Sequence, residues 1–341
     1  MPQDALPPLF RPFETGDLDW PAASDKILLL GAAADVRIPS EFLPKPVMAQ
    51  GFRPDFLALE RRGANISPQI EGDGYDIVLV MVSRHRGESE MRIAEAIDRT
   101  KADGVIIVAG GKSDGVSSLR KRLADLLTLD GHLAKNHGEV LWFRKSSEAT
   151  AYANEVRATL KVLPLVEGRF QTAPGMFSFD RIDAGSRLLV DALPDKLAGA
   201  AADFCAGWGY LSVSLVERNP AIAGVDLYEA DYAALQSAQQ NMETLAPGKP
   251  CTARWLDLTA EKVDQRYDVI VMNPPFHQGR AADPGIGQAM IRAAARSLKA
   301  GGQLFIVANR GLPYETVLKP LFGGITELAA DKTFKVWRAR R

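Results

Sequence analysis

Cysteine and histidine are scarce in this chain of 341 residues, which has two cysteines and four histidines. Cys205 and Cys251 stand in apolar contexts far apart in the sequence. This usage argues against a disulfide framework and for a reducing compartment. The histidines show no spacing typical of metal ligands, so we expect no metal site.

Neither charge sign is in clear excess, since 41 basic and 42 acidic residues give a net charge of −1. No global field therefore attracts nucleic acid, and any contact with RNA must use local patches. No apolar run reaches the roughly 20 residues that a membrane-spanning helix needs. The N-terminal MPQDALPPLF lacks the basic and apolar regions of a secretion signal. We expect a soluble, cytoplasmic protein without membrane contacts, acting as a monomer.

The length predicts two domains, each able to bury its own core. In both halves short apolar runs alternate with segments that have apolar residues at helical spacing. This alternation predicts an α/β protein of two tandem Rossmann-like domains, each with a mostly parallel, doubly wound sheet. We place the boundary near residues 150–165 and divide the chain into domains 1–160 and 161–341. The proline-rich first 24 residues lack periodicity, and we expect them to form a lead-in arm.

The same patterns predict individual elements. Strands are expected at residues 26–31, 76–82, 104–111, 140–143, 201–205, 222–228, 252–256, 269–272, 303–308, 325–330 and 334–339, the last two as an antiparallel pair. Helices are expected at residues 89–101, 117–127, 184–192, 210–218, 232–245 and 289–298, and the stretch 151–169 is expected to be partly helical. Residues 37–49 contain three prolines and are expected to be irregular.

Residues 75–111 run in parallel with residues 267–309. Both segments have Tyr-Asp, an apolar run, a loop, a helical segment ending in Lys-Ala, and a second apolar run. The match predicts a duplicated domain, although unrelated α/β units can share such a layout. The first copy has VSR where the second has NPP. We therefore expect a degenerate N-terminal domain that has lost its chemistry.

The stretch YDVIVMNPPFHQ, residues 267–278, is the strongest candidate for chemistry. Its apolar run ends at Asn273, because Pro274 and Pro275 have no N–H to continue a ladder. Asn273 therefore stands at the carboxyl end of a buried strand, where open α/β sheets bind ligands. Phe276 adds an aromatic ring able to stack on a planar base.

This combination suits the alkylation of an exocyclic or amide nitrogen. Such a nitrogen is a poor nucleophile because its lone pair is delocalised. Hydrogen bonds from its two hydrogens to the Asn273 side-chain oxygen and the Pro274 carbonyl would direct the lone pair at an electrophile. The alternative is a strand that merely ends in a Pro-Pro loop, and neighbouring motifs must decide between the two.

A glycine turn lies upstream in DFCAGWG, where Asp203 ends a predicted strand and a helix follows. Gly207 and Gly209 allow a tight turn and close approach of the backbone to a ligand. About 20 residues further on, Glu229 ends the next strand, where it is placed to accept hydrogen bonds from ribose hydroxyls. Asp226 falls inside that strand and is expected to be structural.

The third strand ends at Asp257, which is suited either to accept from an adenine amino group or to form a turn. G-x-G-x-x-G and a Walker lysine are both missing, which disfavours a dinucleotide or a nucleoside triphosphate. The ligand that fits the glycines, the ribose carboxylate, the adenine acceptor and the nitrogen-orienting Asn273 is S-adenosyl-L-methionine. Its sulfonium methyl is already an activated electrophile, so no nucleophile–base set is needed.

Most of residues 168–341 resemble the class I S-adenosyl-L-methionine-dependent methyltransferases. The segment is similar in particular to the bacterial ribosomal RNA guanine-N2 methyltransferases, namely methyltransferase C of the small subunit and its relative, methyltransferase G of the large subunit. The motifs that carry the resemblance are GMFSFDRIDAGSRLL, DFCAGWGYLS, NPPFHQG, KAGGQLFIVAN, LPY and FKVWRA. That family also has a degenerate N-terminal copy of the methyltransferase domain.

The resemblance implies methylation of a guanine N2 in ribosomal RNA, with the 16S RNA as the expected substrate and ribosomal RNA or a ribosomal subunit as the partner. It assigns the N-terminal domain to RNA recognition or remodelling. It also implies two residue sets: Asp203, Gly207, Gly209, Glu229, Asp257 and Asn273 for the cofactor, and Asn273, Pro274, Pro275 and Phe276 for the target base. Trp208 departs from the family pattern and is expected to reshape the methionine end of the pocket.

Three alternatives remain open. Asn-Pro-Pro-aromatic motifs also serve adenine-N6 DNA methyltransferases and glutamine-N5 protein methyltransferases, where the aromatic is more often tyrosine, so Phe276 and His277 favour guanine N2. The third is a non-catalytic RNA-binding assembly factor that retains a cofactor pocket; the intact motif weighs against it. Basic clusters at residues 84–86, 120–122 and 335–341 are suited to contact phosphate or simply to solvate the surface.

Overall fold

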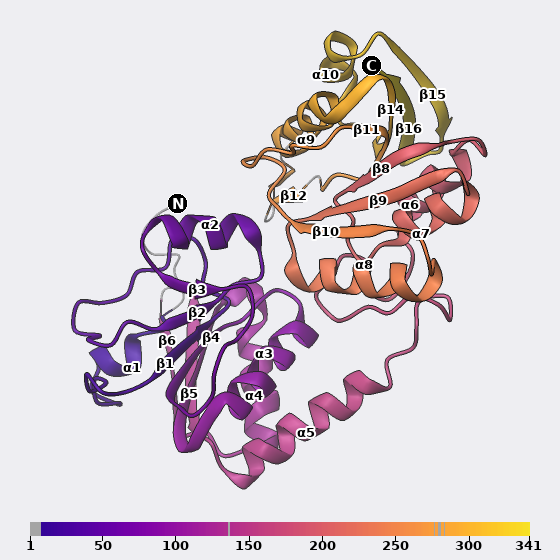
Figure 1. Ribbon diagram of the computed structural model, residues 1–341. Helices are drawn as coiled ribbons and strands as arrows, with labels where there is room; N and C mark the ends of the chain where they lie inside the picture. Colours follow the sequence, from indigo (N-terminus) through magenta and orange to yellow (C-terminus); the bar gives the residue numbers. More distant parts are fainter. Residues whose placement is uncertain (1–7, 136, 276, 279–280, 283) are drawn as a thin grey trace. The chain divides into compact units, whose positions relative to one another are not determined.

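The computed structural model describes residues 8–135, 137–275, 277–278, 281–282 and 284–341, with the backbone alone for 277–278 and 281–282. The chain divides into two compact units, Met1–Leu163 and Pro164–Arg341. Each unit is built around its own seven-stranded sheet (Figure 1).

The sheet of the first unit has the strand order β3-β2-β1-β4-β5-β7-β6. Its pairs are parallel from β3 to β5, whereas β7 runs antiparallel to both of its neighbours. The strands are β1 (Ile27–Leu30), β2 (Val47–Ala49), β3 (Asn65–Ser67), β4 (Tyr75–Met81), β5 (Thr100–Gly111), β6 (Gly131–Lys135) and β7 (Gly138–Arg144). The helices are α1 (Arg11–Glu14), α2 (Arg53–Arg61), α3 (Arg86–Arg99), a 3₁₀ turn (Lys112–Asp114), α4 (Val116–Leu126) and α5 (Ser147–Lys161).

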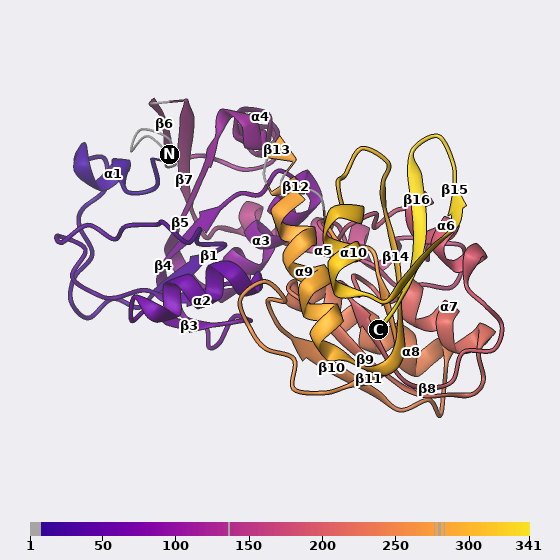
Figure 2. The ribbon, with the colours of Figure 1, turned by 90° about the horizontal axis from the view of Figure 1, so that it is seen from above.

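The sheet of the second unit has the order β10-β9-β8-β11-β14-β16-β15, and again the last two pairs alone are antiparallel. The strands are β8 (Gly199–Phe204), β9 (Ile222–Glu229), β10 (Cys251–Trp255), β11 (Tyr267–Met272), β14 (Leu298–Asn309), β15 (Gly324–Ala330) and β16 (Phe334–Arg340). The helices are α6 (Ala184–Ala192), α7 (Tyr210–Arg218), α8 (Tyr232–Leu245), α9 (Pro284–Ser297) and α10 (Glu315–Leu321). Figure 2 shows a separate short pair, β12 (His277–Gln278) and β13 (Ala281–Ala282), next to the start of α9.

The two sheets repeat one architecture in detail. Both have the same order and the same strand senses, and β5 and β14 have the same pattern of buried and exposed residues. Asp76 in the first sheet accepts from the backbone N–H of Lys26, and Asp268 in the second accepts from that of Ala200. Each aspartate also pairs with a lysine of the next strand. The expectation of two tandem Rossmann-like domains is confirmed, and these details support their duplication.

Helices cover both faces of each sheet, because alternate residues of the central strands are buried on opposite sides. In β11, Val269 and Val271 pack with α6, α7 and α8, while Ile270 and Met272 pack with α9 and α10. Figure 1 shows these helices around the sheet of the second unit. In the first unit α3, α4 and α5 pack on one face and α1 and α2 on the other. This double burial explains why the central strands are continuous apolar runs.

The prediction of a lead-in arm at the N-terminus is wrong for residues 9–20. Phe13 is 3% exposed and lies between Trp20 and Phe42, with ring centroids 5.5 Å away in both cases. Leu9 and Phe10 are buried in the same cluster. These apolar side chains cover one face of the first sheet, a contact that local periodicity could not reveal.

The sequence patterns also missed the strands β2, β3 and β6 and the helix α2 of the first unit. The strands β2 and β3 have three residues each and lie at or next to the edge of the sheet, and β2 falls inside the stretch expected to be irregular. The helix α2 begins with Arg53-Pro54, which is compatible with a first turn because those N–H groups need no helical partner. The strand β6 is an exposed antiparallel edge without an apolar run.

We expect Phe13→Ala to lower the free energy of unfolding by about 3 kcal/mol, because it leaves a cavity among buried aromatic rings. Urea denaturation of the full chain measures this loss. Leu43→Ala is the matched control: that side chain is 67% exposed, and its truncation should cost less than about 0.5 kcal/mol. A Phe13→Ala variant as stable as the control would contradict the burial of this segment.

Candidate active site

The predicted site residues of the second domain gather at one edge of its sheet. Strand β11 pairs with β8 so that Met272 lies beside Phe204, and β8 pairs with β9 so that Phe204 lies beside Tyr228. The residues that follow these three positions therefore lie at the same carboxyl edge of the sheet. Asn273, the turn 205–209 and Glu229 come together there.

The glycine turn leaves open space on one side and packs closely on the other. Gly207 and Gly209 both have positive φ angles, +54° and +91°. A Cβ added to Gly207 would have no atom within 4 Å, whereas one on Gly209 would lie 3.0 Å from the Cα of Ala238. Gly209 thus lets α7 approach α8. Gly207 leaves open space, here called the cradle, in which a ligand can approach the protein backbone.

Glu229 ties the glycine turn to the loop that follows β9. One carboxylate oxygen accepts from the Gly207 N–H at 2.8 Å, and the other accepts from the N–H groups of Ala230 and Asp231 at 2.8 and 2.9 Å. Burial raises the pKa of Glu229, and these backbone donors oppose the rise. A carboxylate has about four lone-pair sites, so acceptor capacity remains for a ligand hydroxyl.

Asp203 lies fully buried beneath this turn. Its Oδ2 accepts from the Ser212 hydroxyl at 2.5 Å, while its Oδ1 has no hydrogen-bond partner among the described residues. Burial, together with the negative charge of Glu229, raises the pKa of Asp203 to about 7. A buried acceptor without a donor is uncommon in a native protein. It fits a ligand that brings hydrogen-bond donors, such as the ammonium or hydroxyl groups of S-adenosyl-L-methionine.

Asp257 forms a turn, one of the two roles that its position suggested. Its Oδ1 accepts from the backbone N–H and the hydroxyl of Thr259, at 2.8 and 2.6 Å. Its own N–H donates to a carboxylate oxygen of Glu261 at 2.9 Å. A contact with an adenine amino group stays a prediction for this residue. Asp226 is structural as expected, since it pairs with Arg254 and accepts from the Tyr267 hydroxyl.

The side chain of Asn273 is held by the start of α6. Its Nδ2 donates to Oδ2 of Asp183 at 3.0 Å and to the hydroxyl oxygen of Ser186 at 2.8 Å. Pro274 is buried and Pro275 exposed, while Phe276 lies outside the described residues. The sequence reasoning did not select Asp183 or Ser186. An aspartate immediately before a predicted helix is a common N-cap signal, but it gives no sign of a contact 90 residues away.

Trp208, between the two glycines, is a packing residue. Its ring is 5% exposed and packs against Phe170 with ring centroids 5.2 Å apart. Its indole N–H donates to the carbonyl of Phe177 at 2.9 Å. The indole therefore anchors the segment before α6 to the glycine turn, and the expected reshaping of the methionine end of the pocket finds no support in this buried position.

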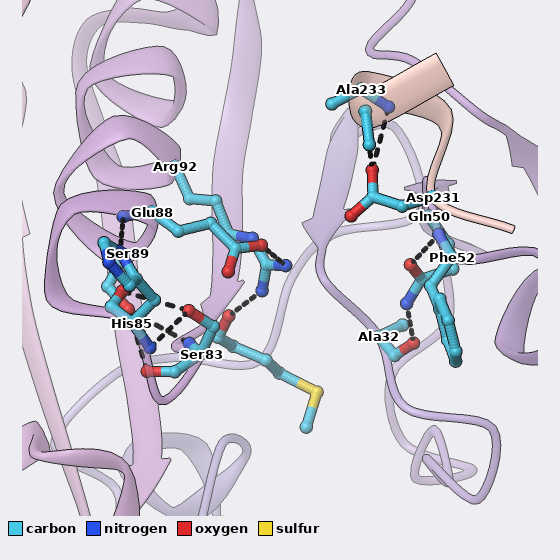
Figure 3. Close-up of polar contacts among 12 residues, drawn as sticks. Ala32, Gln50, Phe52, Ser83, His85, Glu88, Ser89, Arg92, Asp231 and Ala233 are labelled. Atoms are coloured by element: carbon cyan, nitrogen blue, oxygen red, sulfur yellow. Dashed lines mark hydrogen bonds and ion pairs between the residues drawn. The ribbon is translucent and has the colours of Figure 1, made fainter. Parts of the chain in front are cut away.

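The corresponding edge of the first domain is filled by its own side chains (Figure 3). Gln50 stands directly after β2, at the position that Glu229 has at the end of β9. It is buried and spans from the carbonyl of Ala32 (2.6 Å) to the N–H of Phe52 (2.8 Å). A Cβ on Gly31, in the turn after β1, would lie 2.2 Å from Nη1 of Arg92. No open cradle like that at Gly207 exists beside Gly31.

The loop after β4 is closed in the same way. Ser83 and Ser89 exchange hydrogen bonds at 3.0 and 3.1 Å, and Arg92 donates to the carbonyl of Met81 at 2.9 Å (Figure 3). This loop replaces the Asn-Pro-Pro of the second domain. The side chains present at this edge do not fit S-adenosyl-L-methionine, as the degenerate first copy was expected to show.

Within the described ranges, no helix combines the length and apolarity needed to cross a bilayer. In the same part of the chain, His, Cys, Asp and Glu form no cluster of three or more suited to a metal ion.

We expect Asp203→Asn to change how stability depends on pH. The folded pKa of about 7 lies above the ordinary 3.8, so the wild type loses stability as pH rises from about 4 to about 7, where unfolding releases a proton. The variant lacks this loss, and its stability relative to the wild type should rise by roughly 4 kcal/mol over that range. Urea denaturation at several pH values measures the difference, and a constant difference would contradict the raised pKa.

Comparison with known proteins supports the chemistry suggested by this edge. The family model of the methyltransferase small domain matches residues 167–338. A ribosomal RNA small subunit methyltransferase C of Hahella chejuensis is 32% identical over 281 residues, which are 78% of this chain and 78% of that protein. The protein of the same name from Escherichia coli O7:K1 is 30% identical over 264 residues, 77% of this chain and 75% of its own length.

A solved structure has the same fold over nearly the whole chain. It is a T. thermophilus 16S rRNA N2 methyltransferase in complex with AdoMet and guanosine, with a TM-score of 0.75 and 24% sequence identity. The likeness covers 98% of this chain and 92% of the other. The family model and the curated relatives show that the chain belongs to the ribosomal RNA small subunit methyltransferase C family, within the methyltransferases of the small-domain type.

Proposed function

We propose that the second domain transfers a methyl group from S-adenosyl-L-methionine to the exocyclic N2 of a guanine in ribosomal RNA, with 16S RNA as the substrate. The observation that carries the proposal is the orientation of Asn273. Its amide nitrogen is engaged by Asp183 and Ser186, which leaves its oxygen as an acceptor at the sheet edge. The proposal is further supported by a relative named for 16S rRNA N2 methylation, solved with guanosine.

The cofactor, when bound, supplies a methyl group already activated by the positive sulfonium. Glu229 would accept from ribose hydroxyls, and the empty cradle at Gly207 would admit the ligand against the backbone. The unpartnered Oδ1 of Asp203 would accept from a donor of the cofactor. Asp257 would receive the adenine amino group.

For the target base, the Asn273 oxygen and the Pro274 carbonyl would accept the two hydrogens of the guanine amino group. This pairing favours a pyramidal nitrogen and fixes the direction of its lone pair, so the site works by positioning and electrostatics. Pro275 and Phe276 would complete the base-binding segment. A guanine paired in an RNA helix would have to leave the stack before it reached this edge.

Asn273→Ala should lower kcat about a hundredfold or more, because it removes a preorganised acceptor of the reacting nitrogen. The assay follows labelled methyl from S-adenosyl-L-methionine into unmodified small-subunit particles, large-subunit particles and their free RNAs, with nucleoside analysis. Asn154→Ala, which truncates an exposed asparagine of α5, is the matched control and should behave as the wild type.

Label in N2-methylguanosine that Asn273→Ala abolishes would support the proposal and identify the RNA. Label in another nucleoside, or in a ribosomal protein, would instead favour adenine N6 or glutamine N5 as the target. Cofactor binding without transfer to any of these would favour the non-catalytic assembly factor. The cytoplasmic location and the monomeric state expected from the sequence stay predictions.

We also propose that the first domain, residues 1–160, recognises RNA. Most of its basic clusters are engaged in ion pairs: Arg84 with Asp114, Arg86 and Arg122 with Glu90, and Arg120 with Glu139. These pairs leave little positive charge for phosphate.

A hollow of about 230 Å³ at the carboxyl end of β4 suits phosphate better. It is lined by three cations, Arg11, Arg37 and Lys135, and by Glu14, which pairs with Arg11. Within the described part of the chain, Arg37 and Lys135 have no carboxylate partner, so their charge is available to an RNA backbone.

The double variant Arg37→Gln/Lys135→Gln should weaken RNA binding and reduce the slope of log K against log salt by about 1.5 to 2, since two phosphate contacts are lost. Filter binding at several salt concentrations measures the slope, and cofactor affinity should not change. Arg61→Gln/Lys161→Gln removes two exposed cations of the first unit that lie outside the hollow and serves as the control. An equal slope for both double variants would contradict this phosphate site.

A further inference from the structure

We propose that Asp183 and Ser186 are positioning residues that fix the side-chain amide of Asn273 in one orientation before any ligand arrives. The inference rests on the proposed function, in which the Asn273 oxygen accepts from the target nitrogen. Neither residue belongs to the Asn-Pro-Pro motif or to the glycine turn, and both come from the first turn of α6 and its cap.

The hydrogen-bond chemistry allows one orientation of the amide. Both acceptors lie on the same end of the Asn273 side chain, Oδ2 of Asp183 at 3.0 Å and the Ser186 hydroxyl oxygen at 2.8 Å. An ionised carboxylate can only accept, so the group that faces it must be the NH₂. A flipped amide would place its oxygen against the carboxylate and lose the hydrogen bond to Asp183 at a half-buried position. The Asn273 oxygen is therefore turned away from α6.

The two acceptors are themselves held by the helix. Asp183 is the N-cap of α6, and the same Oδ2 accepts from the backbone N–H of Ser186 at 2.8 Å. The positive end of the helix dipole favours the charged carboxylate there. Ser186 is 8% exposed, so solvent offers its hydroxyl little competition. One short segment thus caps α6 and orients the side chain of Asn273 at the end of β11.

Gly185, directly before Ser186, makes this arrangement possible. A Cβ added to Gly185 would lie 3.0 Å from a ring atom of Phe334, at the start of β16. The lack of a side chain lets α6 sit close to β16 while its cap reaches β11. The D-A-G-S sequence of residues 183–186 therefore combines a cap, a close approach and a second acceptor.

Fixing the amide in advance acts on the chemical step. An acceptor that is already aligned needs no reorganisation when the base reacts, so its loss should reduce kcat more than it raises KM. If Asp183 and Ser186 served the fold alone, their loss would change stability and leave the kinetic constants of the folded enzyme unaltered.

The test uses the full chain and two replacements of one residue. Asp183→Ser keeps an oxygen suited to cap α6, but its side chain is shorter and loses the bond to Asn273. Asp183→Asn keeps an acceptor oxygen at the same reach. We expect Asp183→Ser to lower kcat on the RNA substrate about tenfold to a hundredfold with KM changed by less than about threefold. Asp183→Asn should restore most of the loss, and Asp183→Ser with Ser186→Ala should deepen it.

A second measurement needs neither cofactor nor RNA. In ¹⁵N-asparagine-labelled protein the side-chain NH₂ hydrogens of Asn273, assigned with Asn273→Ala, should exchange slowly with solvent. They should exchange at least about tenfold faster in Asp183→Ser, because the NH₂ group then loses its carboxylate acceptor and keeps the Ser186 hydroxyl oxygen alone. Asp25→Ser, which replaces an aspartate that accepts a backbone N–H in the first domain, is the control and should change neither readout.

Wild-type kcat or unchanged amide exchange in Asp183→Ser, with thermal unfolding close to that of the wild type, would overturn the positioning role. Loss of kcat in Asp183→Ser that Asp183→Asn fails to restore would overturn it as well. If Asn273→Ala itself retained guanine methylation, the proposed function would fail instead, and amide exchange would still decide whether Asp183 orients Asn273.

Discussion

The register of β11 between β8 and β14 is the constraint on which the candidate site depends. Met272 lies beside Phe204 on one side and Ile306 on the other, so the chain leaves the sheet next to the glycine turn. The two prolines that follow cannot extend the ladder. A shift by one residue would turn Asn273 to the other face of the sheet and away from α6. The apolar strand residues, buried on both faces, prevent that shift.

The edge held in this way is rich in acceptors. Asp203, Glu229 and Asp183 are acidic, and each carboxylate accepts from at least one backbone N–H or hydroxyl group. Holding acceptors at a buried edge has a cost: burial, and then the negative charge of Glu229, raises the pKa of Asp203. A ligand with positive charge and many donors relieves that cost. S-adenosyl-L-methionine carries a sulfonium and an ammonium, and a guanine amino group brings two further donors.

Local sequence signals were enough to predict the bounds of an element where a single residue marks its start. The bounds of α6, α7 and α8 agree with the prediction, because Asp183, Gly209 and Asp231 mark their starts. Strands buried on both faces were equally visible as apolar runs. The short strands β2 and β3, the burial of Phe13 and the core position of Trp208 depend on partners distant in sequence. The hold of Asp183 on Asn273 belongs to this second kind, although both residues stand in motifs that the sequence made conspicuous.

The two domains separate fold from function within one chain. They have the same strand order, yet Gln50 takes the place of Glu229 and bonds its own loops through a neutral amide. Arg92 fills the space beside Gly31 and is held there by the carbonyl of Met81 and by Glu88. A ligand would have to break these bonds and move a charged side chain, whereas the cradle at Gly207 is empty. The architecture alone therefore does not confer methyl transfer; the side chains at the edge decide it.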